Sequence, residues 1–281
     1  RPEEVKGKIV FFNYHFNQTN INTFESYGPC VYYRWGAPSE AAKMGASAVV
    51  IRSVSSAFDD KPHTGSMSYN KKYPAIPSVA ISNLAADKLA KEINTQGAMR
   101  MYIRTTCEML PDVKSYNVIA EITGSEIPNE IICFGGHLDS WDIGEGAHDD
   151  GAGVVQSIDV IRTFMKLGIK PKRTIRAILF MNEENGLKGG LAYADSAKAH
   201  NEKHILAIES DAGGFSPRGL GTEMDASKRQ VIKQYAPLFL PYGVYDFDQE
   251  EGGADISPLL HQGVPLMGLL PDPQRYFDYH H

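Results

Sequence analysis

The chain has 281 residues, 42% of them apolar and 10% aromatic, which is enough to bury the core of one large domain or two ordinary ones. Its formal charge is −6 and its lysines and arginines are scattered, which argues against a nucleic acid or an anionic membrane surface as a partner. No apolar run reaches the roughly 18 to 20 residues that a membrane-spanning helix needs. The composition therefore indicates a folded globular chain without a membrane span.

The cysteines and the chain ends give few clues to function. Cys30, Cys107 and Cys133 lie far apart without a C-x-x-C spacing, which argues against a cysteine metal site or a redox motif. The first residues, RPEEVKGKIVFF, lack the basic and apolar regions of a signal peptide. The chain also stops directly after the aromatic segment YFDYHH. From these two abrupt ends we expect that the natural protein extends beyond both.

The first hundred or so residues alternate short apolar runs typical of strands with runs typical of helices. The expected strands lie at residues 8–12, 47–53, 76–82 and 99–105, and the expected helices at 38–44 and 84–94. The stretch 53–77 is rich in Ser, Asp, Lys, Pro and Gly and is predicted to be an exposed loop. Together these patterns predict a small α/β or α+β module over residues 1–110.

From about Ser115 the strands and helices become longer and alternate regularly. The expected strands lie at residues 115–122, 130–136, 174–182 and 204–210, and the expected helices at 151–167 and 187–200. Apolar strands that are each followed by a helix are typical of a mixed, mostly parallel sheet sandwiched between helices. We therefore predict an α/β domain over residues 111–281.

Polar residues follow three of these expected strands. One strand runs into His137 and Asp139, the next into Glu183 and Glu184, and the third into Asp211. Any one of them has a simpler explanation, such as a helix cap or a turn. Because ligands bind beyond the carboxyl ends of the strands in such folds, the whole set points to a site at that edge.

So many carboxylates at one crevice would repel one another unless a cation neutralised them. Imidazole and carboxylate ligands without thiolates suit zinc with an open coordination position, and also manganese or cobalt. Four glycines in the loop 144–153 allow tight turns, so that Asp149 and Asp150 are able to point back at the ion. The pattern predicts a divalent metal site.

Five ordered segments, GGHLDS, GAHDDGAG, NEENGLKGG, ESDAG and the final YHH, resemble the co-catalytic dizinc exopeptidases that include bacterial leucyl aminopeptidases and glutamate carboxypeptidases. The resemblance is strongest to the plasma glutamate carboxypeptidase branch and its bacterial members. KGKIVFFN, EAAKMGASAVVIRSV and PHTG resemble the protease-associated domain inserted in those enzymes. The resemblance implies a zinc-exopeptidase, phosphorylase/hydrolase-like fold in residues 111–281 and an inserted protease-associated α/β module in residues 1–110.

The resemblance also assigns roles to individual residues. It implies two Zn²⁺ ions per chain, one bound by His137 and Asp211, the other by Glu184 and His281, and both bridged by Asp149. Glu183 is implied as the general base, which takes a proton from the nucleophilic water and passes it to the leaving amine. Asp139 is implied as the carboxylate that orients the imidazole of His137.

The segment GGADISPLL, residues 252–260, has two interpretations. It is a glycine turn before a helix that Asp255 or Ser257 caps, or it lines the substrate pocket. In the second case Gly253 and Asp255 belong to the substrate-binding residues, and Asp255 contacts a free substrate amine.

The sequence as a whole predicts a metal-dependent exopeptidase that hydrolyses dipeptides or short peptides. Two alternatives stay open: another dizinc amide hydrolysis or a glutaminyl cyclisation, and a non-catalytic receptor-like relative. The residues do not decide between amino-terminal and carboxy-terminal specificity. Relatives of this type imply an extracytoplasmic location, periplasmic, secreted or lysosomal, and a possible homodimer.

Overall fold

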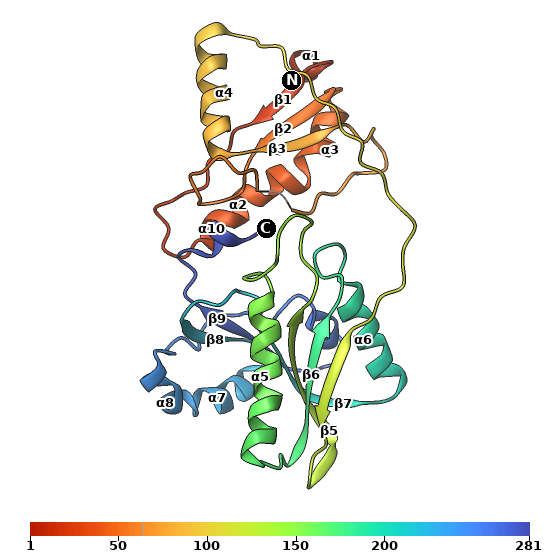
Figure 1. Cartoon of the computed structure of the whole chain (residues 1–281), viewed down its shortest axis with the longest axis vertical. Coiled ribbons are helices and arrows are strands. Elements are labelled where there is room, and N and C mark those ends of the chain that lie inside the picture. The colour runs from red at the N-terminus through yellow and green to blue at the C-terminus, as the bar shows by residue number, and fades with distance from the viewer. Residues whose placement is uncertain (64) are drawn as a thin grey trace. The chain divides into compact units, whose positions relative to one another are not determined.

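The computed structural model describes residues 1–63 and 65–281, which divide into two compact units (Figure 1). Unit 1 contains Arg1–Asp112 and Gln274–His281, and unit 2 contains Val113–Pro273. Thr64, which belongs to the predicted loop 53–77 and to the PHTG segment, lies outside the described residues. The assignment of a protease-associated module and a catalytic domain to these regions stays a prediction.

Unit 1 is built on a parallel sheet with the strand order β1-β2-β3. The strands are β1 (Ile9–Phe12), β2 (Ala48–Arg52) and β3 (Ser78–Ile81), and the helices are α1 (Pro2–Val5), α2 (Phe24–Trp35), α3 (Ala37–Lys43), α4 (Asn83–Gln96) and α10 (Tyr276–Tyr279). All five residues of the central strand β2 are buried, as expected for an apolar run covered on both faces. The predicted strands at 8–12, 47–53 and 76–82 are confirmed, as are the predicted helices at 38–44 and 84–94.

The strand predicted at residues 99–105 is wrong. This segment contains no helix or strand, and the side chains of Met99, Met101 and Tyr102 are 46%, 41% and 83% exposed. Its apolar alternation resembles a strand, but a strand forms only where an apolar face is buried against other elements. Helix α2 was not anticipated. The predicted loop 53–77 contains no helix or strand among its described residues.

Unit 2 contains a six-stranded sheet with the order β4-β6-β5-β7-β9-β8. The strands are β4 (Val118–Ile122), β5 (Ile127–His137), β6 (Arg173–Phe180), β7 (Lys203–Glu209), β8 (Pro217–Glu223) and β9 (Leu266–Pro271). The four central strands run parallel, and the two edge strands β4 and β8 run antiparallel to their neighbours. The predicted α/β class with a mixed, mostly parallel sheet is confirmed, although β8 and β9 were missed.

The helices of unit 2 are α5 (Gly151–Leu167), α6 (Lys188–Ala199), α7 (Ala226–Lys233), α8 (Ala236–Phe239), the short 3-10 helix η1 (Leu240–Tyr242) and α9 (Ser257–Leu260). Helices α6 and α9 pack on the sheet through a core that includes Phe180, Tyr193 and Leu259. Helix α5 packs against β5 and β6 (Figure 1). Its bounds agree with the predicted ones because its ends carry strong signals, the cap Asp150 and the left-handed Gly168.

No helix within residues 1–63 and 65–281 combines the length and the apolar character needed to cross a bilayer.

Candidate metal centre

The polar residues expected at the strand ends lie at neighbouring strands of unit 2. His137 is the last residue of β5, Glu183 and Glu184 follow β6, and Asp211 follows β7. Because β5 pairs with both β6 and β7 in parallel, these three strand ends meet at one edge of the sheet. The loop between β5 and α5 adds Asp149 to the same edge, as the distances below show.

His137 lies at the centre of this group and is only 2% exposed. Its Nε2 atom is 3.0 Å from Oδ1 of Asp149 and 3.3 Å from Oδ1 of Asp211. Its Nδ1 atom lies 2.8 Å from the carbonyl oxygen of Asp139. The imidazole is therefore oriented by a backbone carbonyl on one side and faces two carboxylates on the other.

The carboxylate of Asp139 lies between His137 and the two glutamates. It is 3.8 Å from Nδ1 of His137, whereas its two oxygens accept backbone N–H groups of Glu183 at 3.0 Å and Glu184 at 3.3 Å. Asp139 thus fixes the turn that carries both glutamates, and its carbonyl oxygen contacts the imidazole. The predicted role of its carboxylate in orienting the imidazole of His137 stays a prediction.

Glu184 is held by a residue that sequence reasoning missed. The indole N–H of Trp141 donates to Oε2 of Glu184 at 2.6 Å. Ligand atoms of His137, Asp149 and Glu184 all lie within 4.8 Å of one another, close enough to bind one ion. Trp141 belongs to the same acidic loop, and its indole N–H can only donate a hydrogen bond. Its position among carboxylates is therefore the sequence feature that could have predicted this contact.

Asp150, next to the predicted bridging residue, has both oxygens engaged by backbone groups. Its Oδ2 accepts the N–H of His137 at 3.0 Å, and its Oδ1 accepts the N–H of Gly153 at 2.9 Å. Asp150 therefore ties the end of β5 to the start of α5. This contact holds the loop whose other acid, Asp149, faces the imidazole.

Burial and close carboxylates shift the pKa values of this group. Burial raises the pKa of Asp211 well above its usual range, and burial followed by the charges of Glu184 and Asp149 raises the pKa of Glu183 to about 7. Burial alone would lower the pKa of His137, but the close carboxylates of Asp149 and Asp211 outweigh burial and raise it far above its usual range. The two carboxylates therefore favour a positive charge beside them.

The residues fit a divalent cation. Oδ1 of Asp211 is buried and accepts no well-directed hydrogen bond from the described residues, although Nε2 of His137 is 3.3 Å away. Imidazole and carboxylate donors without thiolates are the set that catalytic zinc sites use. Among the described residues of unit 2, two overlapping groups could hold a metal: His137 with Asp149 and Glu184, and His137 with Asp150 and Asp211. Both oxygens of Asp150 already accept backbone N–H groups, which leaves His137, Asp149, Glu184 and Asp211 as the better ligands.

The predicted ligand His281 belongs to unit 1. Its ring stacks on that of His280 with 3.6 Å between the ring centroids, in a cluster with Tyr27 and Phe277. Its role as a metal ligand therefore stays a prediction from the resemblance.

Asp255, predicted to contact the substrate, is 1% exposed, and neither of its carboxylate oxygens has a hydrogen-bond partner among the described residues. Burial, together with the charges of Glu209 and Glu183, raises its pKa to about 8. Glu209, which was missed because it ends the apolar strand β7, accepts the backbone N–H groups of Asp255 at 3.3 Å and Ile256 at 2.9 Å.

Gly253, the other residue predicted to bind substrate, is half-buried against Glu209. A Cβ atom at this position would lie 2.6 Å from Oε2 of Glu209, which is too close for any side chain. The glycine therefore lets the 252–256 segment approach the fully buried carboxylate. The contacts of Gly253 and Asp255 with a substrate stay predictions.

Known proteins are similar to this chain in sequence and fold. The profile of Peptidase family M28 matches residues 117–281. Carboxypeptidase Q is 35% identical in Bos taurus and 36% identical in Homo sapiens, and in both cases the match covers all of this chain and 58% of the relative. The crystal structure of a peptidase M28 precursor from Shewanella amazonensis SB2B is 34% identical, with a TM-score of 0.85, over 98% of this chain and 67% of that one. The chain thus spans less than two thirds of the curated relatives' length.

Proposed function

This chain belongs to peptidase family M28, and from that premise we propose that it is a metal-dependent exopeptidase acting on dipeptides or short peptides. The observation that carries the proposal is the convergence of His137, Asp149, Glu184 and Asp211 at one edge of the unit 2 sheet. The name of the carboxypeptidase Q relatives supports an exopeptidase and leaves the direction of trimming to experiment.

We propose two zinc ions as the cofactor, held in unit 2 by His137, Asp149, Glu184 and Asp211, with His281 as a further ligand implied by the resemblance. A pair of divalent cations supplies Lewis-acid polarisation of the scissile carbonyl and makes a water molecule nucleophilic near neutral pH. Two observations support this assignment: the acids gather around His137, and the buried Oδ1 of Asp211 accepts no well-directed hydrogen bond from the described residues.

Glu183 is the proposed general base. Its pKa of about 7 suits a group that accepts a proton from water and returns it to the leaving amine near neutral pH. Glu184 differs from it because the indole of Trp141 holds its carboxylate toward His137 and Asp149. Asp139 sets the relative position of the two glutamates through their backbone N–H groups.

The remaining proposals rest on the resemblance. We propose that unit 1 is a protease-associated module, that the protein works outside the cytoplasm, and that it forms a homodimer. The compact division of the chain supports the first of these. Cell fractionation and the molar mass in solution test the other two; a cytoplasmic monomer would contradict both.

Glu183→Gln tests the catalytic assignment. The variant keeps its metal but cannot accept a proton, so turnover of a dipeptide is expected to fall roughly 10²- to 10⁴-fold. Zinc content, measured by elemental analysis, should equal that of the wild type. Glu126→Gln, an exposed position just before the opposite end of β5, is the matched control and should keep full turnover. Near-normal turnover of zinc-loaded Glu183→Gln would reject the role.

A substrate panel tests the reaction class and its direction. Free dipeptides, their N-acetylated forms and their C-amidated forms are each assayed with and without a zinc chelator. Hydrolysis that a free amine requires defines an aminopeptidase, whereas hydrolysis that a free carboxylate requires defines a carboxypeptidase. If zinc-loaded protein hydrolyses none of them, the exopeptidase proposal is wrong.

A further inference from the structure

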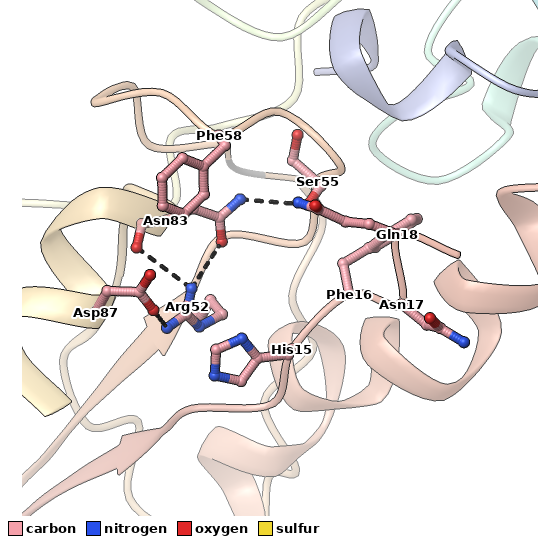
Figure 2. Close-up of a pocket in the computed structure, with 9 residues that line it drawn as sticks. All are labelled: His15, Phe16, Asn17, Gln18, Arg52, Ser55, Phe58, Asn83 and Asp87. Atoms are coloured by element: carbon pink, nitrogen blue, oxygen red, sulfur yellow. Dashed lines mark hydrogen bonds and ion pairs between the residues drawn. The ribbon is translucent and has the colours of Figure 1, made fainter. Parts of the chain in front are cut away.

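Unit 1 contains a cavity of about 450 Å³ at the carboxyl ends of its parallel strands (Figure 2). The cavity is lined by residues that follow β1, by Arg52 at the end of β2, and by the first turn of α4, which follows β3. The carboxyl ends of parallel strands are the usual place for a ligand crevice in α/β folds. Its volume lies within the range of small-molecule sites.

A buried positive charge forms part of the cavity wall. The side chain of Arg52 is 3% exposed and is held on several sides. It donates to Oδ1 of Asn13 at 2.8 Å, to the carbonyl and Oδ1 of Asn83 at 3.2 and 3.3 Å, and to Asp87. A guanidinium has five N–H groups, of which these acceptors use four, and Arg52 lines the cavity.

A negative charge lies directly beside it. Asp87 stands on the second turn of α4 and forms an ion pair with Arg52, and its side chain is 43% exposed. Figure 2 shows the guanidinium between Asp87 and Asn83. The first turn of α4 is capped within the protein, because the N–H of Ala85 donates to Oγ of Ser82 at 3.0 Å. The wall therefore offers one cationic and one anionic position side by side.

Apolar surface completes the cavity. Phe16 is 7% exposed and belongs to a buried aromatic cluster, whereas Phe58 is 61% exposed and lies near Asn83 in Figure 2. Both rings line the cavity. A ligand with an apolar group would therefore bury surface that Phe58 now exposes to water.

We propose that this cavity binds a small zwitterion, specifically a free α-amino acid with an apolar side chain. Its carboxylate would meet the guanidinium of Arg52, its ammonium would meet Asp87, and its side chain would meet Phe58. In an α-amino acid the ammonium and the carboxylate are attached to the same carbon. This short separation of charges matches the direct contact of Arg52 with Asp87 better than the longer separation in a dipeptide does. A phosphate would face Asp87, and a metal ion would face Arg52, so both are disfavoured.

The test uses L-leucine and the full chain. In two-dimensional NMR, leucine should shift the side-chain signals of Arg52 Nε–H, Asn17 and Gln18 in a saturable manner. L-leucinamide and N-acetyl-L-leucine each keep one of the two charges, and each should bind about tenfold more weakly or worse. Leu-Leu, measured in the inactive Glu183→Gln variant, should also bind more weakly. Absence of any shift at 10 mM leucine, about ten times the Kd of a weak millimolar site, overturns the proposal.

Variants separate the cavity from other leucine sites. Asp87→Asn should lower the affinity for leucine about tenfold. The control is Glu25→Gln, which removes an exposed carboxylate of unit 1 outside the cavity and should leave the affinity at the wild-type value. Phe58→Ala, at an exposed position that the fold tolerates, should weaken leucine but leave glycine unchanged. Equal leucine affinity in Asp87→Asn and wild type would reject the site, and so would a tighter complex with Leu-Leu. Binding does not depend on Glu183, so this proposal and the peptidase proposal fail separately.

Discussion

Unit 1 and unit 2 both place charged residues at the carboxyl ends of parallel strands, but they balance those charges differently. In unit 1 the central strand ends in Arg52, whose charge is met inside the unit by Asp87. In unit 2 the strand β5 ends in His137, which faces the carboxylates of Asp149 and Asp211. In both units we propose a ligand site at the carboxyl ends of the parallel strands, and the balance of charge there determines the kind of ligand that we propose.

The consequence differs for the two sites. The charges of Arg52 and Asp87 neutralise each other, so the cavity of unit 1 suits a ligand without net charge. Carboxylates gathered around one imidazole are stable only when a cation or a proton is shared among them. Unit 2 should therefore depend on metal for stability, and unit 1 should not.

Removing the metal gives the largest expected effect and tests this difference directly. Zinc at a concentration about a thousandfold above its Kd is expected to stabilise unit 2 by about 4 kcal/mol, which a chelator removes along with all peptidase activity. Hydrogen exchange should report faster exchange at His137 and Gly153 in the chelated protein, with β2 of unit 1 unchanged. Equal acceleration in both units, or none in unit 2, would contradict the contrast.

Asp139→Asn should give a smaller loss. The amide group that replaces one carboxylate oxygen cannot accept the N–H of Glu183 or Glu184, so the turn that carries both glutamates loses one of its two supports. Turnover is expected to fall about 10- to 100-fold with zinc content nearly unchanged. Asp142→Asn, at an exposed position of the same loop, is the control. Unchanged kinetics in Asp139→Asn would show that the carboxylate does not position the base.

The smallest effect is expected from breaking the ion pair between Arg176 and Glu202 in unit 2, whose charges neutralise each other within the protein. Hydrogen bonds from Arg176 lower the pKa of Glu202, and the two side chains are 2.7 Å apart and 13% and 28% exposed. A lowered folded-state pKa means that the pair stabilises the fold above the unfolded pKa near 4.5 and that this contribution is lost as the pH falls through the lowered value.

Glu202→Gln should therefore cost about 1 kcal/mol of unfolding free energy at pH 7, measured by urea denaturation. The difference between variant and wild type should shrink as the pH falls from 5 to 3, and zinc should not change it. A difference that stays constant over this pH range would show that the ion pair contributes nothing to stability.

Most strands and helices with a strong local pattern were predictable from the sequence. Helix α5 has a cap at Asp150 and a left-handed glycine at Gly168, so its bounds follow from short-range signals. Residues 99–105 have the alternation of a strand but no buried face, and β8 (Pro217–Glu223) carries glycines that hide its pattern. In both cases the outcome depends on whether a neighbouring strand is available, which no local pattern encodes.

The candidate site was predictable at the level of residue identity. His137, Glu184 and Asp211 stand at strand ends, and that position can be inferred from apolar runs and their spacing. Other features of the site depend on contacts between segments that are far apart in the chain. They are the hydrogen bond from Trp141 to Glu184, the close approach of Gly253 to Glu209 and the burial of Asp255. The Arg52 cavity was missed for the same reason.

By itself, the amino-acid sequence determined which residue types stand at the ends of which strands, because apolar periodicity and helix caps act over a few residues. Only the tertiary structure decided which atoms meet: the carbonyl of Asp139 on His137, the backbone N–H groups on the Asp139 carboxylate, and the ion pair of Arg52 with Asp87. Those contacts are set by strand order and by the close packing of distant segments, and their electrostatic strength depends on burial that the folded sheet alone creates.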